Sequence, residues 1–179
     1  VGLSSLNAHA DYARALVDAA GRGDTSVVEL LIGQGVDVNE TYRHGVTSLL
    51  MASLNGHPEV VKLLLAAGAE ADKADEDGIT PLLIASQQGH AAVVRLLIAA
   101  QAEVDKAPTD GATPLYSASR NGHDEVVGLL LAAKAEVDKS KANGVTPLYI
   151  ASQNGHPEVI KLLLAAQADG HIIETVEGL

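Results

Sequence analysis

A single sequence pattern recurs along this chain at a constant spacing of 33 residues. It starts at Gly45, Gly78, Gly111 and Gly144, and the second copy reads Gly-Ile-Thr-Pro-Leu-Leu-Ile-Ala-Ser-Gln-Gln-Gly-His. No insertion or deletion disturbs the register of these copies. A period of 20–50 residues is typical of arrays in which each repeat is one small supersecondary unit. The regular spacing therefore predicts a quasi-linear array of stacked units instead of a domain with one central core.

Each copy predicts two short helices joined by a turn. Thr80 has the residue type of a helix N-cap, and Pro81 follows at the first helical position, where its missing N–H costs nothing. We expect the first helix to end near Gly89 and the second to start after His90. The second helix carries a Val-Val-x-Leu-Leu-Leu face, which a two-helix unit this small cannot bury without stacked neighbours. The polar segments between copies, such as residues 70–77, are interpreted as solvent-facing hairpin tips.

The composition agrees with close-packed helices. The chain has 179 residues, of which 29 are Ala and 24 are Leu, with only four Tyr and no Phe, Trp or Cys. A core made of small and medium aliphatic side chains favours many close-packed helices over an aromatic-centred globule. The lack of Cys excludes disulfides, thiolate metal sites and Cys nucleophiles. It also rules out a disulfide-stapled secreted module and favours an intracellular, cytoplasmic location, although it leaves the compartment open.

The charge balance and hydropathy exclude two classes of partner. A formal net charge of −11 opposes non-specific nucleic-acid binding and docking on anionic membranes. The longest apolar runs are only a few residues, so we expect no membrane span. The first residues, Val1–Leu6, lack a basic start and a long apolar stretch, and they are not interpreted as a signal peptide.

The repeated motifs resemble those of the ankyrin repeat. One unit carries G-x-T-P-L, then A-S-x-x-G-H, then E-V-V-x-L-L-L-A-A, and the resemblance covers roughly residues 10–171. It implies an all-α solenoid of about five stacked antiparallel helix pairs with projecting β-hairpin loops. One departure is systematic, because the His that usually follows T-P-L is replaced by Leu50, Leu83, Tyr116 or Tyr149. This His normally helps to bond the turn, so its loss affects the expected rigidity of the turn and not the fold.

The repeat register defines the expected domain boundaries. They are 1–9 as an N-terminal extension, 10–39 as a capping repeat, 40–72, 73–105, 106–138 and 139–171 as repeats 2 to 5, and 172–179 as a C-terminal tail. The cap assignment rests on Arg14 and Asp18, which place polar side chains where later copies have Thr47 and Met51. Three interpretations of the C-terminal end remain open. The apolar residues there, Ile172, Ile173, Val176 and Leu179, fold over the open end, or the end packs on another copy, or the native chain continues. The last interpretation is slightly favoured.

Two columns of repeated polar residues do not predict catalysis or metal binding. The first is His57, His90, His123 and His156, and the second is Asp72, Asp105 and Asp138. Neighbouring units lie roughly 10 Å apart, whereas zinc needs ligands about 2 Å from one ion. Paired acid–base carboxylates must likewise share one cleft. We therefore expect the His to bond backbone groups at the turn and the Asp to shape turns. No phosphate-binding or G-x-S-x-G motif occurs, and no catalytic residue, cofactor or metal is predicted.

Two short matches have simpler explanations. The Arg-Gly-Asp tripeptide at residues 22–24 is known from adhesion ligands, but it replaces the Asn-Gly-His turn between two helices. The context of Asn39 resembles the target of asparagine hydroxylation in ankyrin repeats. Later copies carry Asp at that position, so at most one site qualifies.

The positions that differ between copies are the candidates for partner binding. In ankyrin proteins, hairpin tips and the ends of first helices line a concave groove where partners usually dock. The acidic tip in the middle of the array predicts a partner patch that contains Lys or Arg. Tyr and Arg are frequent interface anchors. Tyr116 and Tyr149 are, however, also explained by packing in the slot that the missing His leaves. The candidate residues are Tyr42, Arg43, His44, Leu54, Asn55, Asp75, Glu76, Asp77, Gln87, Gln88, Thr109, Asp110, Tyr116, Arg120, Asn121, Asn143, Tyr149, Gln153 and Asn154.

The sequence thus predicts a non-catalytic protein–protein interaction scaffold, monomeric, that binds a protein or peptide with a basic patch. Self-association through the C-terminal end is the alternative oligomeric state. Two other functions remain open. The chain is either the ankyrin segment of a larger enzyme or effector, or an engineered, consensus-like array without a natural ligand. The irregular Ser48, Ser117 and Gly128 argue against an idealised design.

Overall fold

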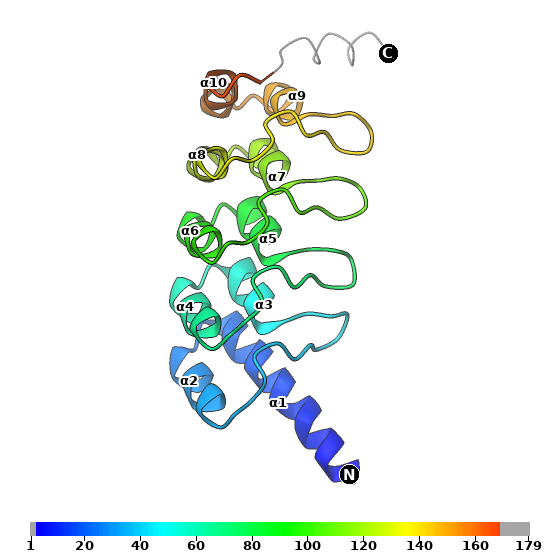
Figure 1. Cartoon of the computed structure of the whole chain (residues 1–179), viewed down its shortest axis with the longest axis vertical. Helices are drawn as coiled ribbons and strands as arrows, with labels where there is room; N and C mark the ends of the chain where they lie inside the picture. Colours follow the sequence, from blue (N-terminus) through cyan, green and yellow to red (C-terminus); the bar gives the residue numbers. More distant parts are fainter. Residues whose placement is uncertain (1–2, 169–179) are drawn as a thin grey trace.

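A computed structural model describes residues 3–168 and contains ten α-helices there, with no strand in that range (Figure 1). The helices follow one another in pairs separated by longer loops. Their bounds are α1 Leu3–Arg22, α2 Thr25–Gly33, α3 Ser48–Asn55, α4 Pro58–Ala66, α5 Pro81–Gln88, α6 Ala91–Ala99, α7 Pro114–Asn121, α8 Asp124–Ala132, α9 Pro147–Gln153 and α10 Pro157–Ala165. The chain is therefore the all-α repeat solenoid that the sequence predicts.

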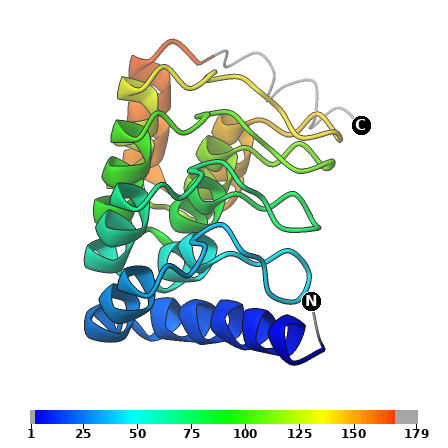
Figure 2. The same ribbon diagram turned by 60° about the horizontal axis from the view of Figure 1, so that its bottom comes forward.

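The helices form two stacked rows with the loops on one side. The odd-numbered helices lie in one row and the even-numbered helices in the other, and each helix contacts the equivalent helix of the next pair (Figure 1). The loops that join one pair to the next project beside the odd-numbered row (Figures 1 and 2). The odd-numbered helices and the loops therefore share one continuous face along the array.

The first helix of each later pair begins after a Thr N-cap as expected, and three of the four end at a left-handed Gly, whereas α9 ends at Asn154. The hydroxyl of Thr80 accepts a hydrogen bond from the backbone N–H of Leu83 at 3.1 Å, and the Thr at the three equivalent positions makes the same bond. Pro81 occupies the start of α5, where no intrahelical N–H bond is lost. Gly89 ends α5 with φ of 79°, a left-handed conformation that costs glycine little. The Thr-Pro and Gly signals in the sequence are thus confirmed.

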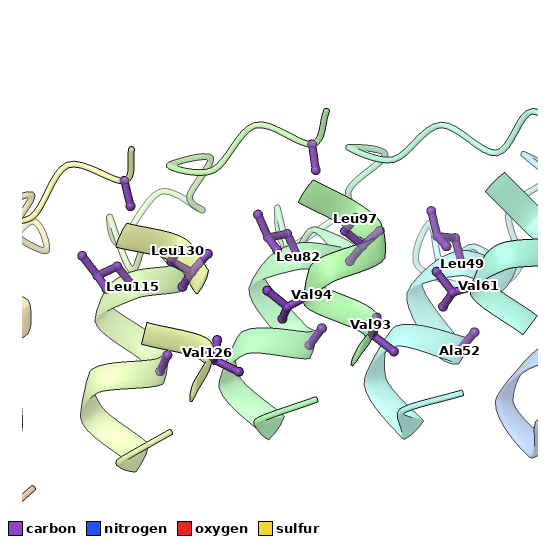
Figure 3. Close-up of a cluster of buried hydrophobic side chains, with 14 of the residues drawn as sticks. Leu49, Ala52, Val61, Leu82, Val93, Val94, Leu97, Leu115, Val126 and Leu130 are labelled. Carbon is purple, nitrogen blue, oxygen red and sulfur yellow. The ribbon is translucent and has the colours of Figure 1, made fainter. Parts of the chain in front are cut away.

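The core is a ladder of identical positions that runs the length of the array. In one rung, Leu82, Val93 and Leu97 are fully buried, and their equivalents recur in the neighbouring pairs (Figure 3). Ala85 is also fully buried, and its small side chain allows neighbouring helices to approach closely. Burying one leucine side chain contributes about 1.5–3 kcal/mol. The stabilising apolar area is thus divided among the junctions between pairs, which explains the composition rich in Ala and Leu.

The N-terminal helix is longer than the other odd-numbered helices and projects past them on the loop side (Figure 2). It begins at Leu3, so the expected boundary at residue 10 falls inside a continuous helix. Arg14 and Asp18, on which the cap prediction rests, are exposed and lie 3.7 Å apart. The expected tail at 172–179, with its question of a C-terminal cap, lies outside the described residues.

The loops are tied together by backbone hydrogen bonds. Tyr42 and Val46 form an isolated antiparallel bridge, and Asp75 N–H donates to Ile79 C=O in the next loop. Successive tips also connect, because Glu76 N–H donates to His44 C=O at 2.9 Å.

In the slot after T-P-L, Leu50, Leu83 and Tyr116 are buried, so a packed side chain takes the place of the missing His.

Candidate partner-binding groove

The repeated histidines join each helix pair to the one before it. His57, His90, His123 and His156 each place Nε2 2.9–3.0 Å from a backbone carbonyl oxygen of the preceding pair. The acceptor of His123, for example, is Gln87 C=O near the end of α5. This confirms that the histidines bond backbone groups. Within residues 3–168, no group of three His, Asp or Glu residues is arranged to hold a metal ion.

The repeated Asp and Asn side chains form a second set of junctions. Asp72 Oδ1 accepts from Glu103 N–H at 2.9 Å, and Asp105 accepts from Glu136 N–H at 3.2 Å. In the first junction Asn39 does the same with Glu70 N–H and also donates from Nδ2 to Gly68 C=O. The Asp residues therefore have a structural role, as expected, but they connect successive loops instead of closing a single turn.

Three of the amides at the first-helix ends serve the same junctions. Asn55, Asn121 and Asn154 donate from Nδ2 to a carbonyl of the preceding pair at 2.8–2.9 Å. Gln88 stands at the equivalent position in α5, and no hydrogen bond of its side chain is found among the described residues. The side-chain amides of the three Asn are thus occupied within the array, although these residues stay exposed.

The hairpin tips are shaped by their own acidic and amide side chains. Asp75 Oδ1 accepts from the backbone N–H of Asp77 and of Ile79 at 3.0 and 2.9 Å. In the next two tips Asp110 and Asn143, which are equivalent to Asp77, each accept from the backbone N–H two residues later. These three side chains therefore fix the shape of the tips on which neighbouring residues are presented.

Asp110 is also held by a cation from the following tip. Its carboxylate lies 2.9 Å from Lys141 Nζ. The hydrogen bond from Ala112 N–H and the contact with Lys141 hold the pKa of Asp110 below its usual value, against a small opposing effect of burial. Lys141 Nζ also lies 5.4 Å from the ring centre of Tyr116. Lys141 thereby links the tip of one loop to the helix and tip of the preceding pair.

A pocket opens where three successive tips face α5 and α7. It has a volume of about 360 Å³. Its walls come from the tip residues and from the helix ends that carry Gln87 and Arg120. Its lining residues are Asp77, Ile79, Leu83, Gln87, Pro108, Thr109, Asp110, Ala112, Tyr116, Ser117, Arg120 and Lys141. The pocket therefore gathers several of the sequence-predicted site residues from neighbouring repeats.

The family comparison agrees with this architecture. A family model described as ankyrin repeats (3 copies) matches residues 16–110 and again residues 101–173. The chain belongs to the ankyrin-repeat family. Ankyrin repeats are in general protein–protein interaction modules, and the fold is typically non-catalytic. A comparison with curated proteins found no match.

The remaining predicted residues of this ankyrin array lie at both ends of the groove. In the first tip, Arg43 lies over the ring of Tyr42 at 5.4 Å, and His44 Nδ1 lies 3.4 Å from a Glu76 carboxylate oxygen. Leu54 and Tyr149 are half-buried, whereas Gln153 is exposed at the end of α9. Tyr116 is only 6% exposed, so its ring packs in the slot after T-P-L and its surface contributes to the pocket wall alone.

Six residues that line the pocket were not among the sequence-predicted sites of this ankyrin chain, and two of them, Ser117 and Lys141, are polar. Ser117 lines the pocket, and the available signal was its departure from Met51, Ile84 and Ile150 at the equivalent positions. Lys141 was part of a predicted tip, but its contacts with Asp110 and Tyr116 depend on how successive tips stack.

No helix of the described part of the chain is long and apolar enough to cross a membrane.

Proposed function

We propose that this ankyrin array is a non-catalytic scaffold that binds another protein through the groove between its hairpin tips and its odd-numbered helices. The observation that carries the proposal is the open pocket in that groove, which is walled in part by charged side chains without internal partners. The Asp77 carboxylate and the Arg120 guanidinium make no ion pair with any residue in 3–168. Unpaired charges beside a pocket are available to a partner.

The mechanism is presentation of side chains on a stiff array. The His, Asn and Asp bonds between neighbouring pairs fix the helix ends and tips relative to one another. A surface that is already ordered loses little conformational entropy when a partner docks. We infer that the partner contacts the middle tip with a patch that contains Lys or Arg, because Glu76 and Asp77 are exposed there. The array acts as a monomer in this mechanism.

The test is quantitative capture of partners from the native source by the intact protein. The variant Glu76→Lys/Asp77→Lys reverses the two exposed charges of the tip and keeps Asp75, which shapes it. The control Asp11→Lys/Glu29→Lys changes the net charge equally on exposed residues of α1 and α2. We expect the tip variant to lose at least ten-fold in captured partner and the control to retain it. Equal capture by both variants would contradict the proposal.

The variant Tyr42→Ala/Arg43→Ala/Arg120→Ala removes three side chains of the groove and introduces no opposite charge there. We expect it to weaken partner binding while the melting temperature stays unchanged, because these side chains are not part of the core ladder. Light scattering after size exclusion measures the oligomeric state, for which we expect the mass of one chain.

A further inference from the structure

One helix position that lines the pocket departs from its equivalents in the other repeats. Ser117 stands where the neighbouring repeats have Ile84 and Ile150, so a hydroxymethyl group replaces a branched apolar side chain. The pocket opens beside it, between the tips of three successive loops and the helices α5 and α7. A larger side chain at this position would occupy part of the roughly 360 Å³ volume.

The pocket combines an apolar floor with hydrogen-bond donors. Ile79 and Leu83 supply apolar surface. Ser117 is 7% exposed, and its hydroxymethyl side chain lines the pocket. Arg120 lies one helical turn further along α7 and lines the same pocket with a guanidinium that makes no ion pair within residues 3–168. Two hydrogen-bond donors thus meet an apolar floor.

The remaining charged residues of the pocket are Lys141, Asp110 and Asp77. Lys141 is paired with Asp110, so these two charges neutralise each other. Asp77 lines the pocket from the preceding tip and makes no ion pair among the described residues. The free charges are therefore one cation, Arg120, and one anion, Asp77.

We propose that this pocket binds a glutamate side chain of the partner. The methylene groups would pack against Ile79 and Leu83, and the carboxylate would accept hydrogen bonds from Arg120 and from the Ser117 hydroxyl. An arginine and a carboxylate form charge-assisted, often bidentate hydrogen bonds. A Lys or Arg close to that glutamate in the partner pairs with Asp77. The partner segment thus combines a glutamate with a nearby basic residue.

This inference rests on the proposed function, because it names the chemistry that the same groove recognises. A lysine side chain fits the pocket less well, since it would meet Arg120 and since the Asp110 carboxylate is already paired with Lys141. A phosphorylated side chain carries more negative charge toward Asp77 and Asp110 at the rim. The phosphorylated side chain is compared with glutamate in the test.

The test is an NMR titration of the full chain with synthetic heptapeptides. Each peptide contains one Lys and one Glu, placed two to four residues apart among Ala and Ser. Matched peptides replace Glu with Gln or phosphoserine. We expect at least ten-fold tighter binding for one Glu spacing than for its Gln and phosphoserine counterparts, with shift changes at Leu83, Ser117 and Arg120. The absence of measurable Glu peptide binding, equal binding of the Gln peptide, tighter binding of the phosphoserine peptide, or shift changes elsewhere would overturn the proposal.

Two variants test the donors and the space separately. Ser117→Ile restores the side chain of the equivalent repeats, so the array stays folded while the pocket is filled. Arg120→Gln removes the cation. We expect both to abolish the preference for Glu over Gln, and the control Arg95→Gln, the same change on α6 outside the groove, to keep it. An unchanged preference in Ser117→Ile would contradict the proposal.

The two proposals fail in different ways. If only the glutamate inference fails, peptides or the partner still bind in the groove, but the binding shows no preference for Glu. Failure of the proposed function leaves capture unaffected by Glu76→Lys/Asp77→Lys.

Discussion

Replacing Gly89 with alanine would disturb the junction between two repeats at a defined atom. Gly89 ends α5 with φ of 79°. A Cβ atom at this position would lie 2.6 Å from Nδ1 and 2.8 Å from Cε1 of the His123 ring. That ring is held in place by the bond between Nε2 and Gln87 C=O at 2.9 Å. The added methyl group can fit only if the ring moves and the bond weakens.

The expected cost has two parts. Placing alanine in the left-handed region costs about 1–2 kcal/mol. Displacing the ring and weakening its hydrogen bond adds about 1–3 kcal/mol, the usual range for an overpacked interior. We therefore expect Gly89→Ala to lower the free energy of unfolding by about 3 kcal/mol. For a chain of this size, that loss lowers Tm by about 6–12 °C.

Gly68 provides the matched control within the same array. It has φ of 91°, and a Cβ atom added to it would point into open space, with no atom beyond its chain neighbours within 4 Å. The equivalent residues in later repeats are Gln101 and Lys134, with φ of 63° and 70°. Gly68→Gln therefore carries backbone strain alone, about 1–2 kcal/mol. Urea denaturation of both variants measures the difference, and equal losses in the two would refute the junction argument.

Three further predictions address other parts of the array. His90→Ala removes the bond to Leu54 C=O and should cost about 1–3 kcal/mol in urea denaturation; a loss below about 0.5 kcal/mol, the smallest usual hydrogen-bond contribution, would contradict its role. Leu97→Ala should cost about 2–5 kcal/mol, because this leucine is fully buried between repeats, whereas the 62% exposed Leu30 should tolerate the same change with little loss in Tm. Asp110 has a lowered pKa, so its contribution to stability is present above its usual pKa and is lost as the pH falls through the lowered value; Lys141→Gln should reduce this acid dependence in a series of thermal melts, and an identical pH profile would count against the contact.

The helices could be predicted from the sequence because their signals are local. Thr80-Pro81 marks the start of α5 and Gly89 its end, and each signal depends only on backbone geometry within a few residues. The stacking could be predicted because an apolar face such as that of α6 must be buried. The 33-residue period then placed equivalent residues in register.

The bonding partners at the junctions could not be predicted in the same way. Asn121 was a candidate partner-binding residue, yet its amide donates to Gln87 C=O, 34 residues earlier, and this requires the rotation between pairs. The pocket beside Ser117 likewise arises from three repeats that contribute to one space. A sequence can show that Ser117 differs from its equivalents, but it does not show whether neighbouring side chains fill the difference.

The central claim is that the groove between the tips and the odd-numbered helices binds the partner. Hydrogen exchange of the full chain, measured with and without a captured partner, tests it most directly. We predict slower exchange in the tips around Asp77 and Asp110 and at the C-terminal ends of α5 and α7, with α4, α6 and α8 unchanged. Protection confined to the even-numbered helices would contradict the account.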